Sequence, residues 1–299
     1  MLSILIPCYE YKITDLVFVL SKMMANETLS YEIIVLDDGS TNQDLITANQ
    51  KINSLPNCKY LYNKINQGRT VTRNELAKIA TYDTLLFLDA DVIPLSQNFI
   101  QKYIPYITQS YNVVCGGYSY SETRPPETFI LRWKYGKSRE QNIAFNRNKN
   151  PFSYIFSGNI LIKKSLFFAS NFTENKNIYG LDIFFSYNLY MQNSTVLHID
   201  NEIVHLGLEP NEKFFKKSLE SVVGRFNYLV DKPEIEKING LIKHYKTINK
   251  WRTKNLVAFL FICFESFLKK QIVKGDPNLL CFDLYRLGYM CSLKNKSNV

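Results

Sequence analysis

The chain has 299 residues, of which 46% are hydrophobic and 14% aromatic, so it can bury a large core and a disordered protein is excluded. Its formal net charge of +9 is concentrated in residues 241–299, where eleven Lys and Arg face three Asp and Glu. The remainder is close to neutral and shows no recognised nucleic-acid-binding motif, so we expect no nucleic-acid partner.

Short apolar runs alternate with helical patterns over the first 118 residues. The predicted strands are Leu2–Pro7, Tyr31–Asp38, Cys58–Asn63, Thr84–Asp91 and Asn112–Tyr118. The predicted helices are Asp15–Met24, Gln43–Asn53 and Arg69–Ala80, with a further helix before Asn112. Such alternation predicts an α/β fold with a mostly parallel, Rossmann-like sheet flanked by helices.

The next segment, Ser119–Phe152, contains seven Lys and Arg among aromatic residues and prolines. Two interpretations stay open here, a mobile substrate loop and a plain surface excursion. After it, Phe156–Phe167 predicts a strand and the start of a helix. The stretch Tyr179–Gln192 predicts a helix opened by Gly180, and Thr195–Glu209 predicts two extended pieces around a turn.

The pattern beyond about Pro210 is helical and basic. We therefore expect a catalytic domain over residues 1–210 and a helical extension over 211–299. Within the former, 1–118 would be the nucleotide-binding half and 119–210 the acceptor-binding half. The extension includes "NKWRTKNLVAFLFICFESFLKKQIVK" (Asn249–Lys274), an apolar centre with basic flanks. It predicts either a helix lying on an anionic membrane surface or an ordinary packed helix.

The compartment is inferred from the cysteines and the apolar runs. Six cysteines form no CxxC pair and lie in apolar surroundings, which favours reduced core residues of a cytoplasmic protein. The longest apolar run, Leu256–Phe264, is interrupted by Glu265 well short of the ~20 residues of a bilayer span. We expect a cytoplasmic protein, on the inner face of the cell membrane if the extension binds lipid.

Polar residues gather where four of the predicted strands end. These ends read "PCYE" (Pro7–Glu10), "DDGST" (Asp37–Thr41), "NQGRTVTRN" (Asn66–Asn74) and "DAD" (Asp89–Asp91). Each alone could be a turn or a helix cap. Because the carboxyl ends of parallel strands share one edge of a sheet, all four together indicate a binding site.

The two carboxylates of "DAD" directly follow an apolar strand. Their mutual repulsion beside a low-dielectric core is costly, and a divalent cation would remove that cost. Oxygen ligands suit Mg²⁺ or Mn²⁺, which commonly binds one or two carboxylates together with substrate phosphates. The alternative is a solvated turn.

Taken together, the motifs resemble those of a family 2 glycosyltransferase with the GT-A fold. They read "ILIPCYE", "VLDDGST", "NQGRTVTRN", "LFLDAD", "FSGNILIKKSLF", "YGLDIFFSYNL" and "IVHLG", and they cover roughly Leu2 to Glu209 in the family's order. The resemblance implies a nucleotide-sugar donor, with UDP favoured through Asp38, and a divalent metal, Mn²⁺ or Mg²⁺.

The resemblance also assigns roles to individual residues. The nucleotide-binding positions it implies are Pro7, Tyr9 and Glu10 at the first strand end, Asp38 at the uracil edge, and Gly68 and Arg73 near the base and diphosphate. It implies contact with ribose and metal for Asp89, direct metal ligation for Asp91, and completion of the metal site by His205. It implies close approach of the donor sugar at Gly158 and Asn159.

By the same resemblance, Asp182 is the general base that removes the acceptor's proton in a single displacement with inversion. The family usually has a Glu-Asp pair here, and Leu181 stands in place of the Glu. The alternative is that Asp182 only caps its helix. Of the other histidines, His198 alternates with apolar residues and is interpreted as packing, and His244 as solvent-facing.

The predicted function is transfer of a sugar from a nucleotide sugar to a saccharide or lipid-linked saccharide acceptor. If the extension lies on a membrane, that membrane surface is a further partner. The rival hypothesis is a non-catalytic nucleotide-binding or scaffold protein on the same fold. The acids Asp38, Asp89, Asp91 and Asp182 favour the enzyme.

Overall fold

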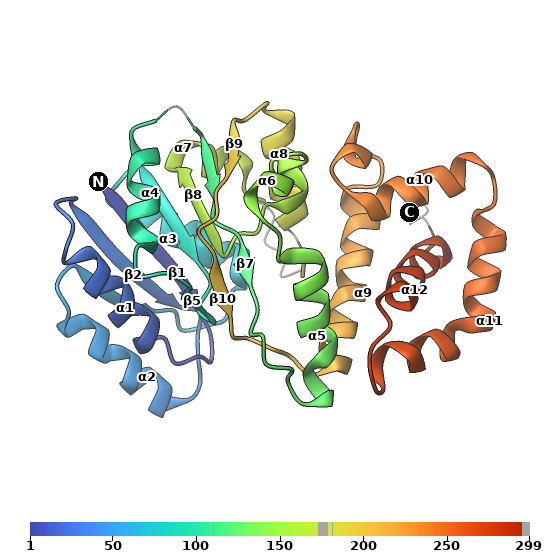
Figure 1. Ribbon diagram of the computed structural model, residues 1–299, viewed down its shortest axis with the longest axis horizontal. Helices are drawn as coiled ribbons and strands as arrows, with labels where there is room; N and C mark the ends of the chain where they lie inside the picture. Colours follow the sequence, from blue (N-terminus) through green and yellow to red (C-terminus); the bar gives the residue numbers. More distant parts are fainter. Residues whose placement is uncertain (110, 173–178, 181, 295–299) are drawn as a thin grey trace. The chain divides into compact units, whose positions relative to one another are not determined.

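The computed structural model describes residues 1–109, 111–172, 179–180 and 182–294. The chain forms two compact units, shown in Figure 1. The first contains residues 1–121, 140–177 and 188–207, and the second contains residues 122–139, 178–187 and 208–299. The predicted functional boundary at residue 210 stays a prediction.

The first unit is built on a seven-stranded sheet of order β3-β2-β1-β4-β8-β6-β9. Its strands are β1 (Leu2–Cys8), β2 (Tyr31–Asp37), β3 (Cys58–Tyr62), β4 (Thr84–Leu88), β6 (Val113–Cys115), β8 (Asn159–Lys163) and β9 (Val196–His198). Strands β1 to β4 are parallel, β8 is antiparallel to both β4 and β6, and β6 is parallel to β9. The predicted fold class, a mostly parallel α/β sheet, is confirmed.

Helices cover both faces of this sheet, as an apolar strand buried on both sides requires. Helix α1 (Thr14–Met24) packs with α4 (Phe99–Ile107), and α3 (Arg69–Ile79) packs with α7 (Lys164–Ser170) on the other face (Figure 1). Helix α2 (Gln43–Gln50) follows β2 and continues into a 3₁₀ turn, Lys51–Ser54.

A second sheet of three short strands differs from the sequence prediction. It contains β5 (Val92–Pro94), β10 (Ile203–His205) and β7 (Tyr118–Ser119), with β10 in the middle. The strand predicted as Thr84–Asp91 ends at Leu88, and the strand predicted as Asn112–Tyr118 is split between the two sheets. The split falls at Gly116 and Gly117, where Gly117 has φ +92°, a conformation that favours glycine.

The basic segment 119–152 contains short helices: Glu127–Phe129, α5 (Ile130–Tyr135), Gly136–Glu140, α6 (Ala144–Arg147) and Pro151–Tyr154. Within it, the Arg147 side chain is 0% exposed. Its Nη2 donates to the carbonyls of Gly116 and Ile199 at 3.3 and 2.7 Å. The idea of a plain surface excursion is therefore wrong at Arg147.

The second unit is helical, as the sequence predicts. It contains the first turns of α8 (Asp182–Met191), then α9 (Asn211–Tyr228), Ile235–Lys237, α10 (Gly240–Lys250), α11 (Lys254–Val273) and α12 (Leu279–Ser292). Two apolar clusters on α9, α10, α11 and α12 form its core. No helix in the described residues is both long enough and apolar enough to span a bilayer.

The cysteines partly match the expectation of core residues. Cys8, Cys58, Cys115 and Cys291 are buried. Cys263 is exposed on α11, so the expectation is wrong there. The error arose because the apolar neighbours of Cys263 are themselves exposed.

Candidate active site

The ends of β1 and β2 are joined by hydrogen bonds from Glu10. Its carboxylate Oε1 accepts from the backbone N–H and the hydroxyl of Thr41 at 2.6 and 2.9 Å. Its own N–H donates to Ser40 Oγ at 2.7 Å. The two bonds from Thr41 lower the pKa of Glu10, because they stabilise the ionised carboxylate. The first two strand ends therefore form one polar rim.

Asp38 anchors the segment that leads from β3 to α3. Its two carboxylate oxygens accept from the backbone N–H groups of Gln67 and Gly68, at 2.9 and 2.8 Å. Gly68 has φ +87° and directly precedes α3. Only 4% of Asp38 is exposed, so the role predicted for it at a base edge stays a prediction.

Asp89, the first acid of the "DAD" motif, is held by two side chains. Oδ1 pairs with the guanidinium of Arg73 from α3, and Oδ2 accepts from the hydroxyl of Tyr118 at 3.2 Å. Burial of the carboxyl opposes ionisation, but the guanidinium groups of Arg73 and Arg69 outweigh it and lower the pKa of Asp89. Asp89 is therefore an anion in a fixed position.

Asp91, the second acid, lies beside His205 because β5 pairs with β10. The register sets Val92 opposite His205, and the N–H of Leu206 donates to the Asp91 carbonyl at 2.8 Å. Asp91 Oδ2 and His205 Nε2 are 3.6 Å apart. This separation exceeds a hydrogen bond, and both atoms are of types that bind Mn²⁺ or Mg²⁺.

Asp91 and His205 fit a divalent ion that takes some of its ligands from the protein and the others from a substrate. The described residues contain no group of three or more His, Cys, Asp and Glu that could hold a metal by itself. Asp91 and His205 would be the protein's share, and phosphate oxygens the rest, as is usual for Mg²⁺. Ligation by Asp89 stays a prediction, because its oxygens contact Arg73 and Tyr118.

Each acid of the motif is packed against a glycine. A Cβ on Gly158 would lie 2.1 Å from Asp89 Oδ2 and from the Tyr118 hydroxyl. A Cβ on Gly207 would lie 1.7 Å from Asp91 Oδ2. No side chain larger than hydrogen fits at either position without moving an acid. The close approach shown at Gly158 is to Asp89, and its predicted contact with the donor sugar stays a prediction.

The remaining predicted residues of this unit differ in what they contact. Asn159 is 1% exposed. Its side-chain oxygen accepts a hydrogen bond from the Tyr103 hydroxyl, and its amide donates to the carbonyls of Gly117 and Asn201, all at 2.7 to 2.9 Å. Tyr9 is 52% exposed and directly follows β1, and Pro7 within β1 is half-buried. The exposed ring of Tyr9 is available for stacking on a base.

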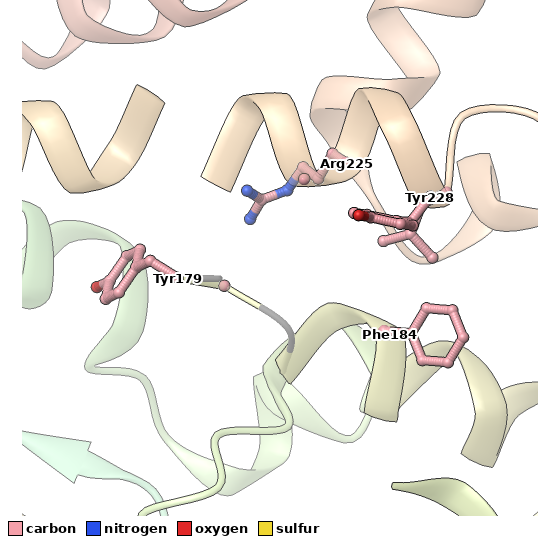
Figure 2. Close-up of a pocket in the computed structure, with 7 residues that line it drawn as sticks. Tyr179, Phe184, Arg225 and Tyr228 are labelled. Atoms are coloured by element: carbon pink, nitrogen blue, oxygen red, sulfur yellow. The ribbon is translucent and has the colours of Figure 1, made fainter. Parts of the chain in front are cut away.

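The predicted base, Asp182, is the first residue of α8 and belongs to the second unit. Leu181 lies outside the described residues. A small cavity of about 10 Å³ nearby has room for one water-sized group. Figure 2 shows Arg225 and Tyr228 of α9 on one side of it, and Tyr179 and Phe184 on the other.

Arg225 links this cavity to Asp182 electrostatically. Burial and the nearby charge of Arg286 lower the pKa of Arg225, while Tyr179 and Asp182 raise it. Its Nη1 donates to the Ser221 carbonyl at 2.9 Å and to the Ser221 hydroxyl. Gly180, with φ +89°, allows the chain to pass this serine, because a Cβ there would lie 1.9 Å from Ser221 Oγ.

The structure thus assembles most of the predicted residues of the first unit at one edge of the sheet. Three residues were not singled out from the sequence: Tyr118, Gly207 and Arg225. Gly207 lies inside the quoted motif "IVHLG", so the motif contained a signal for it. Tyr118 has no local signal, because its partner Asp89 is distant in sequence. For Arg225 the charges of Asp182 and Arg286 that affect it are likewise distant in sequence.

Comparison with known proteins gives one family match. Residues 3–168 match the family described as "Glycosyl transferase family 2", which is more than half of the chain. No curated protein matches the sequence.

Several solved structures share the fold. TarS from S. aureus has a TM-score of 0.50 at 20% identity over 81% of this chain, which spans only 42% of the TarS chain. The TarS fragment 1–349 in complex with UDP-GlcNAc gives the same values over 70% of its length. The mannosyltransferase PcManGT from Pyrobaculum calidifontis, in complex with GDP-Man and Mn²⁺, has a TM-score of 0.62 at 13% identity. The matched region covers 96% of this chain and 85% of the PcManGT chain.

Proposed function

The chain belongs to glycosyl transferase family 2, and from this membership we propose that it transfers a sugar from a nucleotide-sugar donor to a saccharide or lipid-linked saccharide acceptor. The proposed donor is a UDP-sugar, through the resemblance at Asp38. Structures of the same fold in complex with UDP-GlcNAc and with GDP-Man support a nucleotide sugar in general.

The observation that carries this proposal is the placement of Asp91 beside His205, 3.6 Å apart, at the edge where β1, β2 and β4 end. Mn²⁺ or Mg²⁺ bound there would neutralise the diphosphate charge that grows as the glycosidic bond breaks. Arg73 keeps Asp89 ionised and in place, and Gly207 lets Asp91 approach His205.

We propose Asp182 as the general base. Its carboxylate takes the proton of the acceptor hydroxyl while that oxygen attacks the anomeric carbon of the donor. The bond from the anomeric carbon to the diphosphate oxygen breaks in the same step, and the nucleoside diphosphate leaves. A single displacement of this kind inverts the anomeric configuration.

The reaction is proposed to take place in the cytoplasm. A lipid-linked acceptor would bring it to the inner face of the cell membrane, because the lipid part of such an acceptor stays in the bilayer.

A panel of nucleotides and nucleotide sugars with Mn²⁺ tests donor binding by thermal shift. We expect UDP and one UDP-sugar to raise the melting temperature more than the other nucleotides do. Transfer is then assayed with saccharide and lipid-linked acceptors, and the product configuration is read by NMR. A product with retained configuration would rule out the single displacement. Binding without turnover on any acceptor would favour the scaffold hypothesis.

The base is tested with Asp182→Asn. We expect turnover to fall by about 10²- to 10⁴-fold, the usual contribution of a general base, with donor binding retained. Asp231→Asn is the matched control, because Asp231 is an exposed acid of the same unit. Turnover of the Asp182 variant close to that of the control would reject the assignment.

A further inference from the structure

Helix α11 has one face that is firmly packed. Phe261 and Ile272 are buried, at 7% and 0% exposure, in a cluster with α9 and α12. The Phe261 ring meets Tyr285 of α12 at 4.9 Å between centroids, and Glu265 accepts from the Tyr285 hydroxyl at 2.7 Å. Figure 1 shows α11 and α12 side by side. The orientation of α11 about its own axis is therefore set by this inner face.

The opposite face of α11 is apolar and exposed. It consists of Leu256, Phe259, Leu260, Cys263, Phe264 and Phe267, which we call the outer face. The positions follow i, i+3, i+4, i+7, i+8, i+11, so the six side chains form one stripe. Its five large side chains are 45% to 63% exposed. Scattered exposed apolar residues are normal, but a contiguous stripe of this kind marks an interaction surface.

Both ends of the outer face carry positive charge. Arg252 precedes the helix, and Lys270 and Lys274 follow the last phenylalanine; all three are exposed. Within the described residues none of the three has an ion-pair partner. The only acid between Arg252 and Lys274 is Glu265, which bonds to Tyr285 on the inner side. Trp251, 71% exposed, lies next to Arg252.

This charge pattern distinguishes between two partners for the outer face, a second copy of the chain and an anionic lipid surface. If a second copy paired through the outer face, cations would meet cations whether the helices ran parallel or antiparallel, because both ends are basic. An anionic lipid surface instead attracts both basic ends at once. The apolar stripe can then be buried at the boundary between the lipid headgroups and the acyl chains.

We propose that the outer face of α11 docks on an anionic membrane surface. Its phenylalanines and leucines enter the interface, and Arg252, Lys270 and Lys274 contact lipid phosphates. The proposed function matters to this proposal in one respect only, that the enzyme would meet a lipid-linked acceptor at the membrane. Docking itself needs no donor, metal or acceptor.

Vesicle co-sedimentation tests the docking. The full chain is mixed with vesicles of phosphatidylcholine alone or of phosphatidylcholine with phosphatidylglycerol. We expect binding to the anionic vesicles only. The double variant Phe259→Gln/Phe267→Gln should reduce it to background. The control Phe18→Gln/Phe145→Gln, which changes exposed phenylalanines elsewhere, should bind as the wild type does.

The charge contribution is tested with Lys270→Gln/Lys274→Gln. We expect about thirtyfold weaker partitioning, because each lysine near an anionic surface contributes ~1 kcal/mol and 1.4 kcal/mol is a factor of ten. Lys22→Gln/Lys78→Gln removes two exposed lysines of the first unit and should have little effect.

A label on Cys263 gives a readout that leaves the phenylalanines of the outer face unchanged, in the variant Cys281→Ser, which removes the half-buried thiol. An environment-sensitive fluorophore on this exposed thiol should shift its emission to the blue with anionic vesicles and not with neutral ones. Equal binding to both vesicle types, an unshifted label, or a dimer that the Phe259/Phe267 variant abolishes would overturn the proposal. Turnover of that variant on a water-soluble saccharide should stay normal, so failure of docking and failure of the proposed activity give different results.

Discussion

At the scale of single residues, Gly158 and Gly207 determine where the two acids of the "DAD" motif can lie. Asp89 and Asp91 each approach a glycine backbone so closely that a Cβ would overlap a carboxylate oxygen. The two acids are one residue apart in sequence, but they have different partners, Arg73 for Asp89 and His205 for Asp91. Their spacing alone does not reveal this division.

We predict that Gly207→Ala displaces the Asp91 carboxylate. The affinity for a nucleotide in the presence of Mn²⁺ should fall by about 10- to 100-fold, as for other residues that orient a metal ligand. Calorimetric titration measures this. Gly240→Ala is the control, because nothing lies within 4 Å of a Cβ there. An unchanged affinity in Gly207→Ala would show that Asp91 does not contribute to the site.

His198 is a buried histidine that has to stay neutral. Its Nε2 lies 2.9 Å from the Pro151 carbonyl, so it carries the proton, and its Nδ1 lies 3.4 Å from the Arg147 guanidinium. Burial and the charge of Arg147 lower the pKa of His198 to about 4. The sequence-based interpretation as a packed residue agrees with its 2% exposure, and His244 is exposed as expected.

The lowered pKa predicts acid sensitivity. Below its unfolded pKa of about 6.5 the unfolded chain binds a proton at His198 that the folded chain does not, so the free energy of unfolding falls as pH falls from about 6.5 to 4. The loss should reach ~3 kcal/mol. Urea unfolding across this range measures it, and His198→Gln should flatten the curve. His244→Gln, at an exposed position, should not, and equal slopes in both variants would contradict the prediction.

At the scale of elements, β10 is the strand that completes the site. It pairs with β5 on one side and with β7 on the other, so it brings His205 to Asp91 and lies beside Tyr118. Asn159, the first residue of β8, supports this region because its amide donates to the carbonyls of Gly117 and Asn201.

We predict that Asn159→Asp destabilises the protein by about 2–5 kcal/mol. The change leaves two buried carbonyls without their donor and buries a charge. Urea unfolding at neutral pH measures the difference. The control is Asn26→Asp at an exposed position, which should stay within about 0.5 kcal/mol of the wild type. A similar small effect at Asn159 would mean that its hydrogen bonds contribute little to stability.

For the molecule as a whole, the apolar cores of the two units provide the stability, and the proposed metal would be bound together with the substrate. The described residues hold no cluster of three metal-binding side chains. The sheet of the first unit is buried by helices, and the second unit has its own apolar clusters. Removal of metal should therefore affect ligand binding and leave the fold intact.

We predict that EDTA leaves the melting temperature of the ligand-free protein unchanged to within about 1 °C. A nucleotide sugar at about 100 times its Kd, with Mn²⁺, should stabilise the protein by ~2.7 kcal/mol, which is several degrees. EDTA should remove most of that shift. A lower melting temperature of the ligand-free protein in EDTA would show that the metal has a structural role.

Local sequence patterns predicted most strands and helices of the first half, the order of the polar strand ends and the helical character of the extension, but not β5 or the division of Asn112–Tyr118 between two sheets. The predicted features depend on local periodicity and on residues that end strands, so they can be read within a short window. The family resemblance rests on the same local motifs, and the match over residues 3–168 confirms it.

The folded structure was needed to establish the reversed direction of β8, the pairing of β5 with β10 and the fit of Gly207 against Asp91. It also decided which face of α11 is packed on α12 and which is exposed. The physical reason is the same in each case. These features depend on contacts between residues far apart in the chain. The motif "IVHLG" contains Gly207, but a local pattern does not show which distant side chain packs against it.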